Sequence, residues 1–203
     1  MTDNLTKKRI ILASASPRRK EILSSMGASF EVLSADTDES CDITDPASLT
    51  VELATRKGQA VYGLLKERGL AEGAIIISAD TVVACDGRIL GKPSDRQEAK
   101  EMLSLLSGRT HTVATGIAVT VDGRTYSDCS VAEVEVADIP EEGLMRYIDS
   151  GEPFDKAGGY GIQGAFSRWV KGIRGCYFGV VGLPVNLLSE LFFKAVGCYP
   201  DDI

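Results

Sequence analysis

The stretch that decides the fold reads Leu12-Ala13-Ser14-Ala15-Ser16-Pro17-Arg18-Arg19-Lys20-Glu21-Ile22-Leu23. It follows the apolar, partly β-branched residues 10–11, and residues 10–12 together are typical of a buried strand. Ser16 occupies the place of a helix N-cap, Pro17 stands at the first helical position, and Gly27 ends the helix. The sequence therefore predicts a strand joined to an amphipathic helix by a tight turn.

That turn has the composition of an anion-binding site. The unpaired backbone N–H groups of a first helical turn carry the positive end of the helix dipole and attract phosphates. Hydroxyl groups of Ser14 and Ser16 lie beside them, and the guanidinium groups of Arg18 and Arg19 suit phosphate oxygens. A capped helix with two solvated arginines is the alternative. The stretch by itself leaves both interpretations open.

Composition limits the classes of protein to consider. A chain of 203 residues forms one domain, 1–203, or one domain with two lobes. The net charge of −7 argues against a general nucleic-acid or membrane surface, and the first apolar run is too short for a secretory signal. Five cysteines without a CxxC pair argue against a disulfide framework or a zinc site and favour a reducing cytoplasm. The single histidine, His111, is expected to be structural or to support the site from behind a residue that contacts the ligand.

Strand and helix patterns alternate along the chain. Runs rich in apolar and β-branched residues predict strands at residues 30–34, 74–78, 82–85, 88–90, 110–121, 124–137, 165–173 and 176–181. Helical spacing predicts helices at residues 48–68, 94–107, 140–150 and 184–196, and Ser94 to Gln97 form a capping box. Asp86-Gly87 predicts a type I′ hairpin turn, and Asp122-Gly123 a second hairpin. Hairpins beside helix-linked strands indicate an α/β fold with a mixed sheet.

Two acidic positions point to chemistry. Asp36, Asp38 and Glu39 follow the second predicted strand, and clustered carboxylates are the ligands that Mg²⁺ or Mn²⁺ prefers. A solvated acidic loop is the alternative. Asp80 follows the buried run at residues 74–78, and open α/β sheets bind their ligands at such strand ends. A functional role is therefore favoured for Asp80.

Two lysines and a glycine-rich segment add to the candidates. Lys57 lies at the edge of a helical apolar stripe, where a snorkelling side chain is the simpler interpretation. Lys92 stands in the tight loop Gly91-Lys92-Pro93. Residues 151–164 include five glycines, which let backbone approach a ligand closely and leave Gln163 free to pair with an amide-bearing ring. An ordinary flexible loop is the alternative.

Six segments taken together resemble the Maf family. They stand in family order from residue 12 to residue 184 and read Leu12-Ala13-Ser14-Ala15-Ser16-Pro17-Arg18-Arg19, Ser78-Ala79-Asp80-Thr81-Val82-Val83, Gly91-Lys92-Pro93, Ser107-Gly108-Arg109-Thr110-His111, Asp155-Lys156-Ala157-Gly158-Gly159-Tyr160-Gly161-Ile162-Gln163-Gly164 and Val181-Gly182-Leu183-Pro184. Cys176 and Gly179 depart from the family, which more often has Ser and Asn there. The resemblance implies an elongated mixed β-sheet flanked by helices, with two lobes and a central cleft, similar to the inosine triphosphatase group.

The resemblance also implies an activity. Members of the matching branch are nucleoside triphosphate pyrophosphatases that convert dTTP and UTP, and modified pyrimidine nucleotides, to the monophosphate and pyrophosphate. Glu39 and Asp80 would be catalytic and would hold a divalent ion, Mg²⁺, Mn²⁺ or Co²⁺, with Asp80 also the candidate base. The substrate would be bound by Ser14, Ser16, Arg18, Arg19, Lys57, Thr81, Lys92 and Gln163, of which Thr81 and Gln163 would select the base. A cytoplasmic homodimer with a role in nucleotide house-cleaning or cell-division arrest is implied.

Two other functions stay open at this point. One is a non-catalytic regulator of septum formation that binds nucleotide or protein. The other is a pyrophosphatase of a sister branch that acts on 7-methyl-GTP or other modified nucleotides. A pure binder has no need of Glu39 and Asp80 beside a basic cluster, and the run through Gln163 resembles the dTTP and UTP branch.

Overall fold

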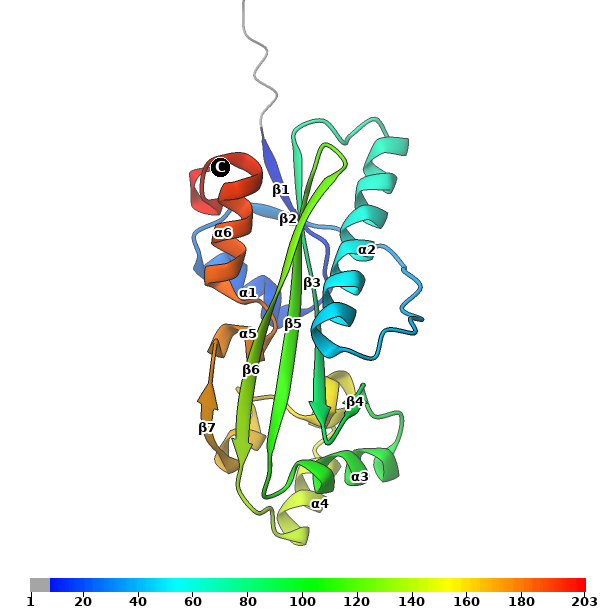
Figure 1. The fold of residues 1–203 in the computed structure, drawn as a ribbon, viewed down its shortest axis with the longest axis vertical. Helices are drawn as coiled ribbons and strands as arrows, with labels where there is room; N and C mark the ends of the chain where they lie inside the picture. The colour runs from blue at the N-terminus through cyan, green and yellow to red at the C-terminus, as the bar shows by residue number, and fades with distance from the viewer. Residues whose placement is uncertain (1–7) are drawn as a thin grey trace, which may run out of the picture.

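The computed structural model describes residues 8–203, and a seven-stranded mixed sheet runs along the molecule (Figure 1). Its strand order is β2-β1-β3-β5-β6-β7, and β4 pairs with β3. The strands are β1 (Arg9–Leu12), β2 (Phe30–Val32), β3 (Ala74–Cys85), β4 (Arg88–Leu90), β5 (Thr110–Val121), β6 (Arg124–Val136) and β7 (Val170–Arg174). β1 lies parallel to β2 and β3, and the other pairs are antiparallel. The predicted mixed α/β fold is confirmed.

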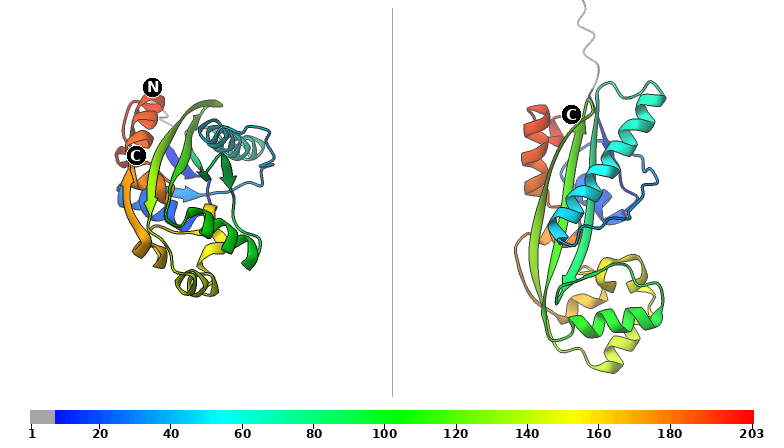
Figure 2. Two further views of the ribbon diagram at one scale, coloured as in Figure 1. Left: turned by 60° about the horizontal axis from the view of Figure 1, so that its bottom comes forward. Right: turned by 45° about the vertical axis from the view of Figure 1, so that its right-hand side comes forward.

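Helices cover both faces of the sheet and one of its ends. They are α1 (Pro17–Ser25), α2 (Pro46–Glu67), α3 (Arg96–Leu106), α4 (Glu141–Asp149), α5 (Tyr177–Val181) and α6 (Val185–Val196). α2 packs on one face, α1 and α6 on the other, and α3 and α4 form a second lobe at the lower end (Figure 2). Within residues 8–203, no helix is long and apolar enough to cross a membrane.

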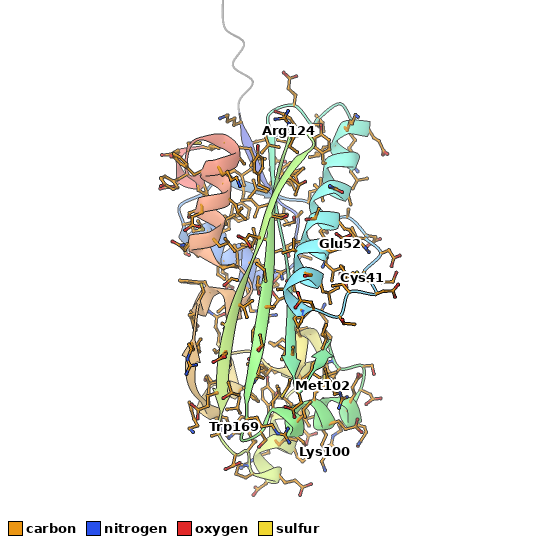
Figure 3. The ribbon with its side chains drawn as sticks, in the orientation of Figure 1. Cys41, Glu52, Lys100, Met102, Arg124 and Trp169 are labelled. Carbon is orange, nitrogen blue, oxygen red and sulfur yellow. The ribbon has the colours of Figure 1, made fainter. Side chains whose placement is uncertain are left out.

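The core follows from the apolar runs that predicted the strands. Ile75 and Ile77 of β3 pack among side chains of α1 and α6, whereas Ile76 packs against α2. β3 is therefore buried on both faces, as its continuous apolar run predicts. A separate cluster, which includes Leu103 and Phe166, fills the lower lobe. Met102 and Trp169 are labelled in that lobe in Figure 3.

Both hairpin turns form as predicted. Asp86 and Gly87 have φ values of 49° and 73°, and Asp122 and Gly123 have 49° and 77°. Positive φ at both central residues is the requirement of a type I′ turn, whose twist matches the flanking strands. The turns close β3 onto β4 and β5 onto β6.

The predicted break in β3 is absent. The runs at residues 74–78 and 82–85 belong to one strand, and Asp80 lies in its middle, opposite Gly116 of β5. The antiparallel ladder with β5 continues past Asp80 from Ile75 to Ala84. Because backbone pairing with β5 does not depend on the side chain, the polar Asp80 interrupts the apolar run without ending the strand.

Three local predictions were wrong in detail. Residues 176–181, predicted as a strand, form α5, with the Cys176 thiol accepting from the Gly179 N–H at 3.4 Å. Residues 165–169 form a 3₁₀ turn before β7. Periodicity does not distinguish strand from helix in such short apolar runs. The N-cap of α3 is Asp95, which accepts from the backbone N–H of Glu98 at 2.8 Å, so the capping interaction is shifted by one residue.

Candidate active site

A cavity of about 740 Å³ lies where β1 ends beside β3. β1 pairs with β3 only as far as Ile77, and β4 joins the same edge of β3 from Val83. Residues 78–82 therefore have no neighbouring strand on that edge. Side chains on opposite faces of β3, Asp80 and Thr81, both reach the cavity around this open edge.

On the α2 face, one lysine joins the two predicted catalytic carboxylates. The Lys57 Nζ lies 2.5 Å from Asp80 Oδ1 and 2.8 Å from Glu39 Oε1. The Asp80 and Lys57 side chains are largely buried, at 13% and 19% exposure, whereas Glu39 is 62% exposed. The hydrogen bond from Lys57 lowers the pKa of Glu39. Lys57 thus does not snorkel into solvent, because its ammonium group is held in the cavity.

The close approach of α2 to the sheet puts Lys57 there. Gly116 of β5 packs directly against the backbone of Thr50, and a Cβ atom at Gly116 would overlap that backbone. Gly58 likewise faces Ser78 and Thr120, with room for no side chain. Because the helix lies so near the sheet, the side chain of the residue before Gly58 reaches Asp80.

On the other face, Arg19 is partly buried and held by three hydrogen bonds. Its Nε donates to the Gly182 carbonyl at 2.8 Å, Nη1 to Ser14 Oγ at 3.2 Å and Nη2 to Thr81 Oγ1 at 3.0 Å. Burial lowers the pKa of Arg19, and the negative charge of Asp80 opposes that shift. Arg19 therefore ties α1, β3 and the residue after α5 together beside the cavity.

The remaining residues of the predicted anion site divide into two groups. Ser16 and Arg18 line the cavity, and Arg18 Nη1 lies 3.8 Å from Asp155 Oδ2 across it. Ser14 is buried behind Arg19, and its Oγ also accepts from the Ser16 N–H at 3.3 Å. The Ser16 side chain makes no cap hydrogen bond, although Ser16 does precede α1 as predicted.

The glycine-rich segment forms the opposite wall of the cavity. It includes short 3₁₀ turns at Glu152–Asp155 and Ala157–Gly159, and Gln163 follows them in the cavity lining. The Glu152 carboxylate accepts from the Tyr147 hydroxyl at 3.2 Å and from the Ala165 N–H at 3.1 Å. Glu152 thus ties the start of the segment to α4 and to the residue after the segment's end, and the flexible-loop alternative is not supported.

His111 is buried next to the cavity wall. It is 3% exposed, and its Nε2 lies 2.7 Å from the Tyr160 hydroxyl in the cavity wall. Burial lowers the pKa of His111 to about 4. Among residues 8–203, its Nδ1 is the one buried side-chain nitrogen or oxygen without a hydrogen-bond partner.

The cavity gathers nine of the ten predicted site residues, all except Ser14. They are Ser16, Arg18, Arg19, Glu39, Lys57, Asp80, Thr81, Lys92 and Gln163. Sequence reasoning missed Asp155 and Lys156, which also line the cavity although they stand in a quoted motif. It also missed Thr115, whose position opposite Thr81 depends on the β3–β5 register. Cys41 reaches the cavity from the loop before α2 (Figure 3).

Comparison with known proteins identifies the family of the chain. The family model described as "Maf-like protein" matches residues 9–195. A dTTP/UTP pyrophosphatase of Agathobacter rectalis is 47% identical over 194 residues, covering 90% of this chain and 95% of the relative. Proteins of the same name from Thermococcus onnurineus and Bacillus cereus are 43% and 45% identical; the alignments cover 90% and 91% of this chain, and 95% and 89% of the relatives. The chain therefore belongs to the Maf-like protein family.

Proposed function

We propose that this chain hydrolyses dTTP and UTP to the nucleoside monophosphate and pyrophosphate. The observation that carries the proposal is one cavity lined by five cationic side chains, by four carboxylates that include Glu39 and Asp80, and by the neutral side chains of Thr81 and Gln163, which suit a nucleotide base. Relatives at 43% to 47% identity are named dTTP/UTP pyrophosphatase, which supports this choice among nucleotide reactions.

The cations suit a triphosphate. Arg18 and Lys92 line the cavity from opposite lobes, and the Arg18 contact with Asp155, at 3.8 Å, is long enough to be exchanged for a phosphate oxygen. The first turn of α1 adds its unpaired N–H groups. Arg19 is already engaged, so we assign it mainly to holding this wall in place.

The reaction breaks the phosphoanhydride bond between the α- and β-phosphates and adds one water molecule. Asp80 is the largely buried carboxylate of the cavity, and we assign it to accept a hydrogen bond and a proton from that water. Lys57 keeps Asp80 oriented, and its positive charge balances both carboxylates. Pyrophosphate is the leaving group, and the cationic side chains of the cavity neutralise its negative charge.

Glu39 and Asp80 also fit a divalent cation. A single ammonium group contacts both of them, so both carboxylates face one cationic position. No cluster of three or more His, Cys, Asp or Glu side chains suited to a metal occurs in residues 8–203, but Mg²⁺ commonly uses one or two carboxylates together with substrate phosphates. We propose that these two residues hold Mg²⁺, Mn²⁺ or Co²⁺, which would supply charge that polarises the phosphate oxygens.

Pyrophosphate release by the purified protein tests the proposal, with dTTP, UTP, CTP, purine triphosphates and 7-methyl-GTP as substrates. We expect Asp80→Asn to lower turnover of dTTP and UTP by roughly a hundredfold or more, because the proton acceptor is lost. Asp149→Asn is the matched control, since Asp149 pairs only at the surface with Arg96. Near-normal turnover by Asp80→Asn, or activity confined to 7-methyl-GTP, would contradict the assignment.

Two further proposals need their own measurements. The resemblance implies a homodimer, which light scattering of the purified protein tests. All five cysteines are free, which supports the proposal of a reducing cytoplasm. Fractionation of cells that produce the protein tests that location.

A further inference from the structure

A buried threonine controls which way the Thr81 hydroxyl points. Thr115 lies opposite Thr81 in the β3–β5 pair and is fully buried. Its Oγ1 lies 2.8 Å from the Gly179 carbonyl oxygen and 2.9 Å from Thr81 Oγ1. A carbonyl oxygen only accepts, so Thr115 must donate its one proton to Gly179. The proton between the two threonines must therefore come from Thr81.

The same reasoning leaves Thr81 with one free position. A hydroxyl oxygen has one proton and two lone pairs. The proton of Thr81 goes to Thr115, and Arg19 Nη2 donates to one lone pair at 3.0 Å. One lone pair remains for a ligand in the cavity. Thr81 can thus accept a hydrogen bond from a ligand, but it cannot donate one while this network holds.

Helix α5 fixes the far end of the network. The Gly179 N–H donates to the Cys176 thiol at 3.4 Å, which holds the peptide at the start of α5. A Cβ atom at Gly179 would lie 2.9 Å from Ser130 Oγ, so the backbone also packs tightly against β6. The Gly182 carbonyl at the end of α5 accepts from Arg19. Both ends of the chain of hydrogen bonds are therefore anchored in one short helix.

We propose that Thr115 is a positioning residue that makes the cavity select uracil and thymine over cytosine. Uracil and thymine carry an N3–H donor, whereas cytosine has a bare N3 acceptor. Thr81, as an acceptor, pairs with N3–H and faces the lone pair of a cytosine N3 unfavourably. Phosphate oxygens are also acceptors and cannot donate to Thr81. Thr81 therefore suits a contact with the base and not with the triphosphate. This inference rests on the proposed nucleotide function and names its base-selecting group.

Equilibrium binding of the α,β-methylene analogues of UTP and CTP tests the inference without turnover. We expect the wild-type protein to bind the UTP analogue at least about tenfold more tightly than the CTP analogue. A ligand that leaves a buried polar group without a hydrogen-bond partner typically loses this much affinity. In Thr115→Val the Thr81 proton is free to turn toward the ligand. The ratio of the affinities for the UTP and CTP analogues should therefore fall toward one. Thr115→Ser keeps the hydroxyl and should restore the preference.

Thr120→Val is the matched control. Thr120 lies on the same strand, is fully buried and bonds Thr125 at 3.1 Å, but it lies outside the cavity lining. We expect it to leave the ratio unchanged. Equal weakening of both analogues in Thr115→Val would overturn the inference, because it would show a purely structural role.

A ligand pair tests the wild-type protein directly, should Thr115→Val fail to fold. We expect the α,β-methylene analogue of 3-methyl-UTP, which has no N3–H, to bind at least about tenfold more weakly than that of 5-methyl-UTP, which has the same number of atoms and keeps the donor. Equal binding of the two analogues would overturn the inference. It is the result expected if Thr81 contacts a sugar hydroxyl group and not N3 of the base. A protein that binds UTP selectively but hydrolyses nothing would refute the proposed hydrolysis and leave the role of Thr115 supported.

Discussion

At the scale of single residues, two adjacent arginines have different tasks. Both side chains are partly buried, but Arg19 donates to three hydrogen-bond acceptors, whereas Arg18 touches only Asp155 among the charged groups. Sequence alone treats the pair alike. The difference arises because successive helical residues point about 100° apart, so Arg19 reaches Thr81 of the sheet and Arg18 reaches Asp155.

Arginine substitutions should separate stability from binding. We expect Arg19→Ala to lower the free energy of unfolding by about 2 kcal/mol or more, because it removes the hydrogen bonds to Ser14, Thr81 and the Gly182 carbonyl. Arg19→Lys should not restore it, since an ammonium cannot reproduce the guanidinium fork. Arg18→Ala should leave stability nearly unchanged and weaken nucleotide binding. Urea unfolding and calorimetric titration measure the two effects, and equal loss of stability in both alanine variants would contradict this division.

His111 should make stability depend on pH. The unfolded chain takes up a proton near pH 6.5, the ordinary histidine pKa, whereas buried His111 stays neutral down to a pKa of about 4. The free energy of unfolding should therefore fall as the pH drops from about 6.5 toward 4, by up to about 3 kcal/mol, and should be unaffected above that window. Urea unfolding of wild type and His111→Gln across this range isolates the contribution. Parallel pH profiles would show that His111 does not titrate in this way.

At the scale of elements, the distance between α2 and the sheet governs the site. That distance depends on the missing side chain at Gly116, which the backbone of Thr50 contacts. Lys57 reaches Asp80 only because the helix lies this close. A glycine in a strand is unfavourable by itself, so its presence here reflects the packing it allows.

Glycine substitutions test that packing. We expect Gly116→Ala to destabilise the protein by about 1–3 kcal/mol, because α2 must move away from β5, and to lower turnover as Lys57 moves from Asp80. Gly63→Ala in α2 is the control, since no atom lies within 4 Å of a Cβ atom placed at Gly63. It should stabilise α2 by about 0.5–1 kcal/mol. Thermal unfolding and pyrophosphate release measure both variants, and a harmless Gly116→Ala would refute the close-packing argument.

At the scale of the whole molecule, the cavity joins the two lobes. Arg18 belongs to the upper lobe and Asp155 to the lower one, and their ion pair spans the cavity. A bound nucleotide that engages Arg18 and Gln163 would contact both lobes at once. Ligand binding should therefore stabilise the lobes together.

Hydrogen exchange tests this coupling. With a non-hydrolysable dTTP analogue at about a hundred times its Kd, we expect unfolding to cost about 2.7 kcal/mol more. Amide protection should rise both at the start of α1 and at residues 156–164. The surface of α3 around Gln97 and Lys100, which lies outside the cavity lining, is the internal control. Protection confined to one lobe would contradict a site shared by both.

The sequence by itself determined the local elements and the chemistry of their side chains. Turn residues such as Asp86-Gly87, the helix start at Pro17 and the buried run at residues 74–78 are local signals, because backbone conformation and periodicity depend on near neighbours. Charged residues in family order indicated a nucleotide site. Local signals did not predict the secondary structure of short apolar runs without a clear period, such as residues 176–181.

Only the tertiary structure decided how those parts form one site. Asp80 and Thr81 share a cavity although they point to opposite faces of β3, because β1 ends at Leu12 while β3 continues. The hydrogen bonds of Arg19 and the hydrogen bond from Thr81 to Thr115 depend on strand register and on helix α5, which follows them far along the chain. Such contacts join residues distant in sequence, and no local pattern records them.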